Sequence, residues 1–371
     1  MKYLALAALL AASACGGGGG TSGSSGLFSD HPYNAVPPTS SYTQSVIAIP
    51  NVPGTTAWSI DIGLVDGTGA FYYLADKTNF GVDVVDLNAN TYVTTISGTG
   101  KLAFQGNTGV SKSSGPNGIL FVGTSKLYAN DGNNTVKVID LGTRTVTKSI
   151  ALGGKSRADE GSYDPDDNIA LVDSDSDSPV FQSFINTTTD TLIGTLKRPD
   201  ATSGMEASIY VSSMHAFVQA VPATKTNKNG EIDFIDPVAE SIRNVYPMPN
   251  KCGPTGLALG PSGELLVACS DPGETYILDI GDGHTLAQIN QAGGGDQSAY
   301  DPATNRFYVS NSNSTSDGTK TGAPTPVFTV IDAGTKFFIE NVPIEAHAHS
   351  LAAYNGRIFV PRPSLGVAVY K

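Results

Sequence analysis

The chain has 371 residues, is rich in glycine (42 residues) and has few charged side chains (15%). This composition is typical of many short strands joined by tight turns, and it disfavours a protein built from amphipathic helices. The formal net charge of −12 at pH 7 argues against nucleic-acid binding, since neutralising phosphates requires clustered Lys and Arg.

The N-terminus has the features of a signal peptide. Lys2 precedes an apolar run over residues 4–12 that is too short to span a bilayer. Residues 12–15 (ASAC), followed by five glycines, resemble a bacterial lipoprotein signal, in which Cys15 becomes the lipidated N-terminus. The first of these residues is Ala where that family usually has Leu, and the same residues also fit ordinary signal cleavage. Gly16 in place of Asp resembles outer-membrane sorting.

The next segment, GGGGGTSGSSG (residues 16–26), has no side chains to bury and predicts a flexible spacer. We therefore expect residues 1–14 to be a signal peptide, residues 15–44 a lipid-anchored flexible tether and residues 45–371 one folded domain. This organisation predicts an exported protein of the bacterial cell envelope. It would be attached by its lipid alone at the outer membrane or the periplasmic face, or it would be secreted.

One unit then recurs six times along the chain. Each copy has two bulky apolar residues, an Asp or Asn, a short polar turn and another apolar stretch, as in VIDLGTRTVTKSI. The marker residues are Asp86, Asp140, Asn186, Asp236, Asp279 and Asp332. A strand-built unit that recurs about every 50 residues predicts a β-propeller. Asp and Asn bond their own backbone two residues on, so we expect the markers to fix turns and not to act in chemistry.

Each marker follows a second apolar strand and, further upstream, a shorter inner strand that opens on a polar residue. A seventh pair of strands begins at His347, but the chain ends in GVAVYK before an outer strand can form. SVIAIPNV (Ser45–Val52) can supply that strand and leave no sheet edge unpaired. The sequence therefore predicts an all-β fold. It is a seven-bladed β-propeller with four-stranded antiparallel blades, its ring closed by an N-terminal strand in the C-terminal blade.

The remaining cysteines, Cys252 and Cys269, form an even pair. A turn near residues 261–263 folds one strand back on the next and brings Cys269 across from about residue 254. In an oxidising compartment this places the two within reach of a disulfide. Two free buried thiols are the alternative, and in both cases the pair is structural.

The unit KLYANDGNNTVKVIDLGTRTVTKSIALGG (residues 126–154) resembles the repeats of YVTN-type seven-bladed propellers. The resemblance extends from the first blade to the last and is specific for the fold. It implies little about function, because that superfamily includes envelope binding proteins, lactonases of the gluconolactonase type and lyases.

In a propeller the innermost strands line a central channel, and the residues that open these strands lie near one mouth of it. Aligning the seven units places at that mouth Asp61, Asn117, Glu160, Glu206, Thr255, Gln297 and His349. Oxygen ligands of this kind suit Ca²⁺ or another divalent cation. The alternative is that these side chains cap backbone groups and hold channel waters. Three acids in one mouth repel each other unless a cation or a proton is shared, which supports the cation hypothesis.

Gluconolactonase-type enzymes hold one divalent metal at this point with a Glu, two Asn and an Asp. This chain offers the residue types in Glu160, Asn117 and Asp61, without that family's flanking motifs. The resemblance thus implies an alternative function, a metal-dependent lactonase or lyase in which the metal polarises a carbonyl and activates water.

A second candidate metal site lies near the C-terminus. Glu345, His347 and His349 alternate along a segment that we expect to be extended, so they would share a face and could ligate zinc or copper. Asp173, Asp175 and Asp177 begin like a calcium loop but lack the glycine and the final acid of an EF-hand, which predicts a solvated acidic loop.

Three long segments are expected on the face that carries this mouth, over residues 97–116, 220–230 and 310–326. Extra loop length on one face of a rigid scaffold predicts a recognition surface, with uncommitted insertions as the alternative. We expect a monomer that binds a small molecule, an ion or an envelope protein there. A lactonase or lyase and a scaffold in an envelope complex are the alternatives. No nucleophile elbow, phosphate loop or nucleophilic cysteine indicates a catalytic residue.

Overall fold

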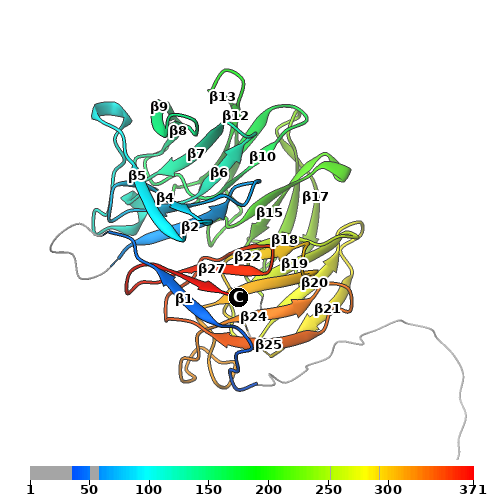
Figure 1. The fold of residues 1–371 in the computed structure, drawn as a ribbon. Helices are drawn as coiled ribbons and strands as arrows, with labels where there is room; N and C mark the ends of the chain where they lie inside the picture. Colours follow the sequence, from blue (N-terminus) through cyan, green and yellow to red (C-terminus); the bar gives the residue numbers. More distant parts are fainter. Residues whose placement is uncertain (1–35, 51–57, 251, 292) are drawn as a thin grey trace, which may run out of the picture. The chain divides into compact units, whose positions relative to one another are not determined.

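A computed structural model describes residues 36–50, 58–250, 252–291 and 293–371 (Figure 1). The predicted signal peptide, Cys15 and most of the predicted tether lie outside the described residues. In the part that is described, no helix has the length and apolar character needed to cross a membrane. The only helices there are three short 3-10 turns, η1 (Gly100–Leu102), η2 (Ser111–Ser113) and η3 (Ser212–Met214).

The described residues form seven four-stranded antiparallel sheets, which confirms the predicted fold class. Six of the sheets are made of four strands that pair in chain order. Blades 1 to 3 are β2 (Ile60–Val65), β3 (Phe71–Asp76), β4 (Gly81–Asp86) and β5 (Thr91–Ile96); β6 (Ile119–Val122), β7 (Lys126–Asp131), β8 (Thr135–Asp140) and β9 (Thr145–Ala151); β10 (Gly161–Asp164), β11 (Ile169–Ser174), β12 (Val180–Asn186) and β13 (Thr191–Arg198). Blades 4 to 6 are β14 (Ser208–Val211), β15 (Ala216–Val221), β16 (Glu231–Asp236) and β17 (Ser241–Pro247); β18 (Pro254–Leu259), β19 (Glu264–Cys269), β20 (Thr275–Asp279) and β21 (Thr285–Ile289); β22 (Ser298–Asp301), β23 (Arg306–Asn311), β24 (Val327–Asp332) and β25 (Phe338–Pro343).

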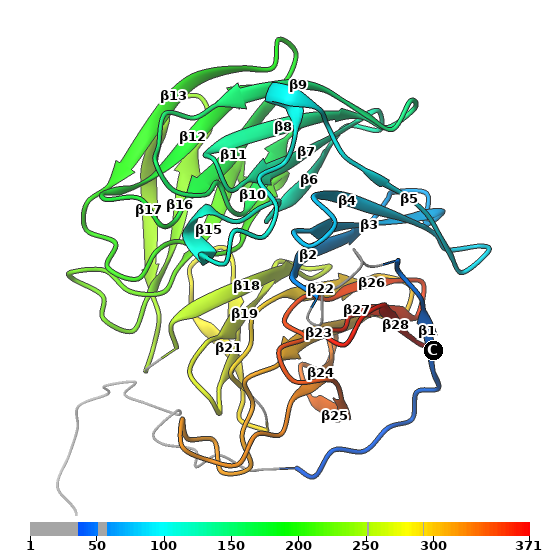
Figure 2. The same ribbon diagram turned by 90° about the vertical axis from the view of Figure 1, so that its left-hand side faces the viewer.

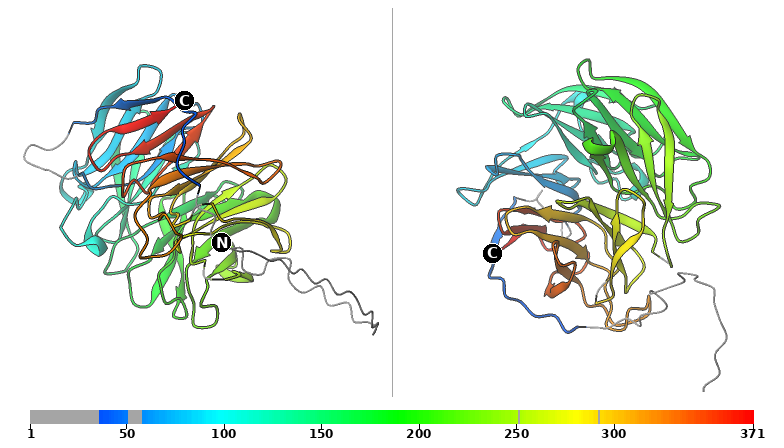
Figure 3. Two further views of the ribbon diagram at one scale, coloured as in Figure 1. Left: turned by 90° about the horizontal axis from the view of Figure 1, so that it is seen from below. Right: turned by 90° about the vertical axis from the view of Figure 1, so that its right-hand side faces the viewer.

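The blades follow one another around a ring. The innermost strand of each blade contacts those of its two neighbours, in the order β2, β6, β10, β14, β18, β22, β26 and back to β2. Figure 2 shows the blades in sequence order around a central axis, and the right-hand view of Figure 3 shows them from the opposite side. All seven inner strands therefore line one channel.

Blade 7 closes the ring with strands from both ends of the propeller. It contains β26 (Ala352–Tyr354), β27 (Arg357–Pro361), β28 (Val367–Tyr370) and the N-terminal strand β1 (Gln44–Ile47). β1 pairs antiparallel with β28, so the predicted closing strand is confirmed, although it ends at Ile47. The end of the predicted tether is also bound to the propeller, since Thr39 N donates to Asn341 O at 2.9 Å.

The core lies between neighbouring blades, where the apolar faces of two sheets meet. Tyr72 of blade 1 and Phe359 of blade 7 are both fully buried, and their rings stack with centroids 5.6 Å apart. The strands of each blade alternate their side chains between the two neighbours, which is why each repeat carries apolar residues on both faces.

The six markers fix the turns between the third and fourth strands, as predicted. Asp86 Oδ1 accepts hydrogen bonds from the backbone N–H groups of Asn88 and Ala89, both at 2.8 Å. The other five markers accept equivalent bonds, from Thr143, Thr188, Val238, Gly281 and Thr335.

A disulfide joins Cys252 to Cys269, with their Cα atoms 4.7 Å apart. Cys269 pairs with Pro254 across the β18–β19 ladder, so the register predicted from the turn is confirmed as well. The bond ties the segment that enters blade 5 to the end of its second strand.

Candidate functional site

The channel mouth is formed by the residues that precede or open the inner strands. Backbone hydrogen bonds define equivalent mouth positions in four blades. In each of these blades one mouth residue donates its N–H to the carbonyl oxygen of the fifth residue of the second strand. The donors are Asn117, Asp159, Glu206 and Asp296, at 2.8, 2.8, 3.0 and 2.9 Å from their acceptors.

The alignment made from sequence is therefore one residue off in two blades. Asp159 and Asp296 hold the shared position, and the predicted residues Glu160 and Gln297 each come one residue later. The inner strands are short, and a shift of one residue turns a side chain to the other face, so spacing alone did not fix their register.

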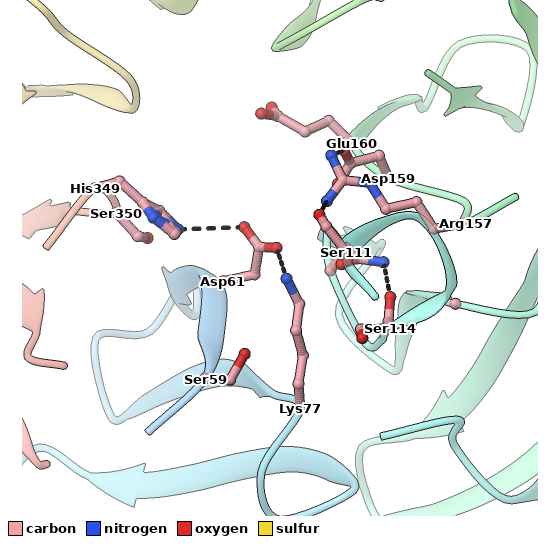
Figure 4. Close-up of polar contacts among 12 residues, drawn as sticks. Ser59, Asp61, Lys77, Ser111, Ser114, Arg157, Asp159, Glu160, His349 and Ser350 are labelled. Carbon is pink, nitrogen blue, oxygen red and sulfur yellow. Dashed lines mark hydrogen bonds and ion pairs between the residues drawn. The ribbon is translucent and has the colours of Figure 1, made fainter. Parts of the chain in front are cut away.

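Asp61 lies between two basic side chains at the mouth (Figure 4). Its Oδ2 is 2.5 Å from Lys77 Nζ and its Oδ1 is 3.4 Å from His349 Nε2. Burial by itself would raise the pKa of Asp61, but Lys77 and His349 outweigh it and hold this pKa below its ordinary value. Asp61 is thus an ionised carboxylate that already has partners.

Asn117 and Thr255 are buried and join one blade to the next. Asn117 Nδ2 donates to Ser114 O at 2.9 Å and to Ala158 O at 3.0 Å. Thr255 Oγ1 lies within hydrogen-bond distance of Ala268 O and Gly295 O, at 3.2 and 3.0 Å. These contacts match the alternative in which mouth residues cap backbone groups.

Three carboxylates from different blades converge in the mouth. Glu160 of blade 3, Glu206 of blade 4 and Asp296 of blade 6 each offer an oxygen, and these oxygens all lie within 4.8 Å of one another. Gln297 Nε2 donates to Glu160 Oε1 at 2.7 Å, which links blade 6 to blade 3 across the channel. We call Glu160, Glu206 and Asp296 the acid cluster.

Burial and mutual repulsion make the acid cluster hard to ionise. Burial raises the pKa of Glu160 well above its ordinary value, and the carboxylate of Glu206 raises it further. Burial likewise raises the pKa of Glu206, with Asp296 adding to the effect. The pKa of Asp296 is also raised by burial, although His349 opposes this. Raised pKa values of this kind favour a shared proton or a bound cation over three free carboxylates.

A second charged group borders the cluster and is already paired. Arg157 Nη2 lies 2.5 Å from Asp159 Oδ2 (Figure 4). The same nitrogen lies 3.0 Å from Asp175 Oδ2. In the described part of the chain, by contrast, Glu160, Glu206 and Asp296 form no ion pair with Lys or Arg.

Behind the mouth the channel holds a cavity of about 410 Å³. Glu160 and Gln297 border it at the end that precedes β10, and Pro165 borders it where β10 has ended. Between them the walls are mostly apolar, with side chains such as Ile62 and Leu257. An apolar cavity with a polar group at one end is a usual form of ligand site.

The second candidate metal site is not formed as predicted, because the segment that carries Glu345, His347 and His349 is not extended. The chain turns at residues 346–347, where His347 has φ 66°, so the expected alternation along a strand does not apply. Glu345 accepts hydrogen bonds from Arg362 Nε at 3.1 Å and Ser364 N at 2.6 Å. His349 faces Asp61 instead.

The Asp173–Asp177 segment is less solvated than we expected. Asp173 is fully buried, and burial raises its pKa well above the ordinary value. Asp177 accepts hydrogen bonds from the N–H groups of Lys155 and Ser156, with distances of 3.0 to 3.1 Å. These acids hold the preceding loop in place, and Asp175 binds Arg157.

Sequence reasoning missed four residues of the mouth: Asp159, Asp296, Lys77 and Arg157. Asp159 and Asp296 were visible as the first members of adjacent polar pairs, Asp159–Glu160 and Asp296–Gln297. Lys77 and Arg157 lie in loops with no fixed place in the repeat, so only the folded chain relates them to the mouth.

No protein-family model matches the chain, and no curated protein matches its sequence. Solved structures do resemble it. A chain of Kuenenia stuttgartiensis hydrazine synthase aligns with a TM-score of 0.65 and 13% identity, covering 86% of this chain and 98% of that one. A chain of the mitotic checkpoint complex aligns with a TM-score of 0.67 and 12% identity, covering 93% of this chain and 97% of that one. U3-55K aligns with a TM-score of 0.67 and 12% identity, covering 90% of this chain and 99% of that one. At such identities the likeness shows the fold alone, and the fold is that of a seven-bladed β-propeller.

Proposed function

We propose that the protein is an exported, lipid-anchored binding protein that holds a divalent cation, Ca²⁺, at the acid cluster. The export and the anchor rest on the signal-like residues 1–14 and on Cys15. The cation site rests on one observation, the convergence of three carboxylates from three blades.

Charge balance supports a cation at this point. Asp61 already has Lys77, and Asp159 already has Arg157. The acid cluster has no such ion pair in the described part of the chain, and burial raises the pKa of each of its carboxyl groups. A bound cation would supply the missing positive charge.

The ligand type supports calcium, because the acid cluster offers only oxygen ligands. Ca²⁺ binds carboxylate oxygens at about 2.3–2.6 Å, so oxygens on opposite sides of one ion are about 4.8 Å apart. The oxygens of the acid cluster all lie within this separation. Glu160 is oriented by Gln297, which fixes one ligand before the ion arrives.

The lactonase alternative has less support. Its implied ligand set included Asp61, but this carboxylate is paired with Lys77 and is not among the acids whose oxygens converge with Glu160. The third alternative, a scaffold in an envelope complex, has no observation of its own beyond the long loops.

Calcium binding can be tested by thermal unfolding of the purified protein at pH 7.5, with and without CaCl₂. At a concentration of 100 Kd the ion should stabilise the folded state by about 2.7 kcal/mol. For a propeller of this size that corresponds to a rise in Tm of about 4 °C. We expect Glu206→Gln to abolish the rise, because it removes one of three ligands, and Asp282→Asn, in an exposed turn, to keep it.

An equal rise in the wild type and Glu206→Gln would contradict this assignment. So would the absence of any response of the wild type to Ca²⁺, since the acid cluster would then be balanced by protons alone.

A further inference from the structure

A second group of possible metal ligands lies at the other end of β10. It consists of Asp164, Asp167 and His215, whose ligand atoms all lie within 4.8 Å of one another. Asp164 ends β10, whereas Glu160 precedes this strand, so about 13 Å of extended chain separates the two sites. The second group is therefore independent of the acid cluster.

Asp164 is fully buried, and one of its oxygens has no partner. Its Oδ1 accepts hydrogen bonds from the N–H groups of Asp166 and Asp167, at 2.8 and 3.3 Å. Its Oδ2 is buried and accepts no hydrogen bond from the described residues. The Tyr210 hydroxyl also interacts with the Asp164 side chain, but its well-formed hydrogen bond is to Asp166 Oδ2, 2.8 Å away. A buried carboxylate oxygen without a donor is costly, and a bound cation would remove that cost.

Asp167 and His215 complete the group from two different blades. Asp167 lies in the turn between β10 and β11 of blade 3, and His215 follows η3 in blade 4. Asp167 Oδ2 is 2.7 Å from His215 Nε2, and their side chains are 33% and 46% exposed. One side of the group is therefore open to an ion from solvent.

The turn that carries the two acids is already held against blade 4. Asp166 Oδ2 accepts from Ser212 Oγ at 3.0 Å as well as from Tyr210. Asp164 and Asp167 are thus positioned beside His215 before any metal binds, which lowers the ordering cost of binding.

We propose that Asp164, Asp167 and His215 bind one divalent transition-metal ion, Zn²⁺, which links blade 3 to blade 4. Imidazole and carboxylate ligands are those that zinc takes in proteins, with bonds of about 2.0–2.2 Å, whereas Ca²⁺ takes oxygen ligands. Three protein ligands leave the fourth tetrahedral position for water or for an outside ligand.

The chain contains a matched control of the same residue types. Asp279, Asp282 and His284 also converge, but all three lie in or beside one turn. The side chains of His284 and Asp282 are 56% and 68% exposed, and Asp279 Oδ1 already accepts from Gly281 N. No side-chain oxygen of this group is both buried and without a hydrogen-bond partner, so we expect it to bind zinc weakly.

The test is titration of the purified, metal-free protein with ZnCl₂ at pH 7.5, measured by calorimetry and by competition with a chromophoric chelator. We expect one tight site in the wild type. His215→Ala should weaken it by about 100-fold or more, since loss of an outer-shell partner alone typically costs 10–100-fold. His284→Ala and Glu206→Gln should leave it unchanged. Asp164→Asn should also weaken it.

Cobalt substitution gives a second readout at the same site. Co²⁺ bound through imidazole should give visible absorption bands that His215→Ala abolishes and His284→Ala keeps. Because the His215 side chain is nearly half exposed, this variant is expected to fold even if Asp164→Asn does not. Equal zinc affinity in the wild type and His215→Ala would overturn the proposal, and so would a wild type that binds no zinc.

Discussion

A buried cluster between blades 3 and 4 gives a quantitative prediction for the dependence of stability on pH. Arg198 contacts three acids, Asp233, Glu231 and Asp200, of which the first two are buried with it. Burial raises the pKa of Asp233 to about 7. The positive charge of Arg198 opposes this rise, but Arg198 also pairs with the other two acids, and the negative charge of Glu231 raises the pKa of Asp233 further. The perturbation that tests this is Asp233→Asn, which keeps the shape of the side chain and an oxygen for Arg198.

The direction in which stability changes with pH follows from proton binding by Asp233. Between pH 3.8 and about 7 the folded protein holds a proton on Asp233 that the unfolded chain has lost. The contribution of this group to stability is therefore complete below pH 3.8 and is lost as the pH rises through the folded value. Each pH unit of that interval is worth about 1.4 kcal/mol, which gives about 4 kcal/mol in all. Relative to the wild type, Asp233→Asn should thus gain about this much stability between pH 4 and pH 8.

The assay is urea unfolding at pH values from 4 to 8, followed by the fluorescence of Trp58. This residue is the only tryptophan of the chain and is buried, so its emission reports unfolding. Asp200→Asn is the matched control, because hydrogen bonding to the same Arg198 lowers the pKa of Asp200. Its contribution to stability is complete above pH 3.8, so Asp200→Asn should differ from the wild type by a nearly constant amount between pH 5 and pH 8. A difference between wild type and Asp233→Asn that stays constant from pH 4 to pH 8 would refute the reasoning.

Four further outcomes are expected. Replacing Cys252 by Ser should lower the free energy of unfolding by about 3 kcal/mol in urea titrations, because Cys252 and Cys269 are 17 positions apart and their bond closes a loop of that size in the unfolded chain. Gly118→Ala should lower the unfolding free energy by about 1–3 kcal/mol, since its Cβ would lie 2.1 Å from Asp159 O. Asp332→Ala should cost about 1 kcal/mol, measured in the same way, through loss of its turn hydrogen bonds. Calcium affinity, measured by calorimetry, should fall as the pH is lowered, because protons compete with the ion for the carboxylates of the acid cluster, whose pKa values are raised.

The fold could be predicted from sequence because its determinants are local and repeated. Each marker turn, such as the one at Asp140, uses hydrogen bonds to residues two or three positions away. The alternation of apolar residues within each strand is equally local. The closing strand was found by counting, since one blade lacked a strand and only one free segment could supply it. No ladder had to be identified by long-range pairing.

The site was predicted only in part, because the relevant distances are set by the ring and not by the repeat. Spacing placed Glu160 and Glu206 at the mouth but assigned Glu160 to the wrong register. The β2–β3 and β18–β19 ladders contain bulges that the other inner ladders lack, so the register of the inner strand differs between blades. The hydrogen bond between Gln297 and Glu160 joins residues 137 positions apart. It forms because both side chains extend into the channel, which the repeat spacing does not show. Asp164 and His215 share no repeat position, so nothing in the spacing relates them.

The closing strand sets the order in which the propeller can be completed. Thr43 and Lys371, which are 328 positions apart, meet beside the β1–β28 ladder. β1 precedes every other strand in the chain, and its partner β28 is the last strand of the ring. Blades 1 to 6 each contain all four of their strands and can form in turn, but β1 must keep an unpaired edge throughout this time. The final step of folding is therefore the search of the first strand for the last, which is a contact of very high sequence separation and is expected to be slow.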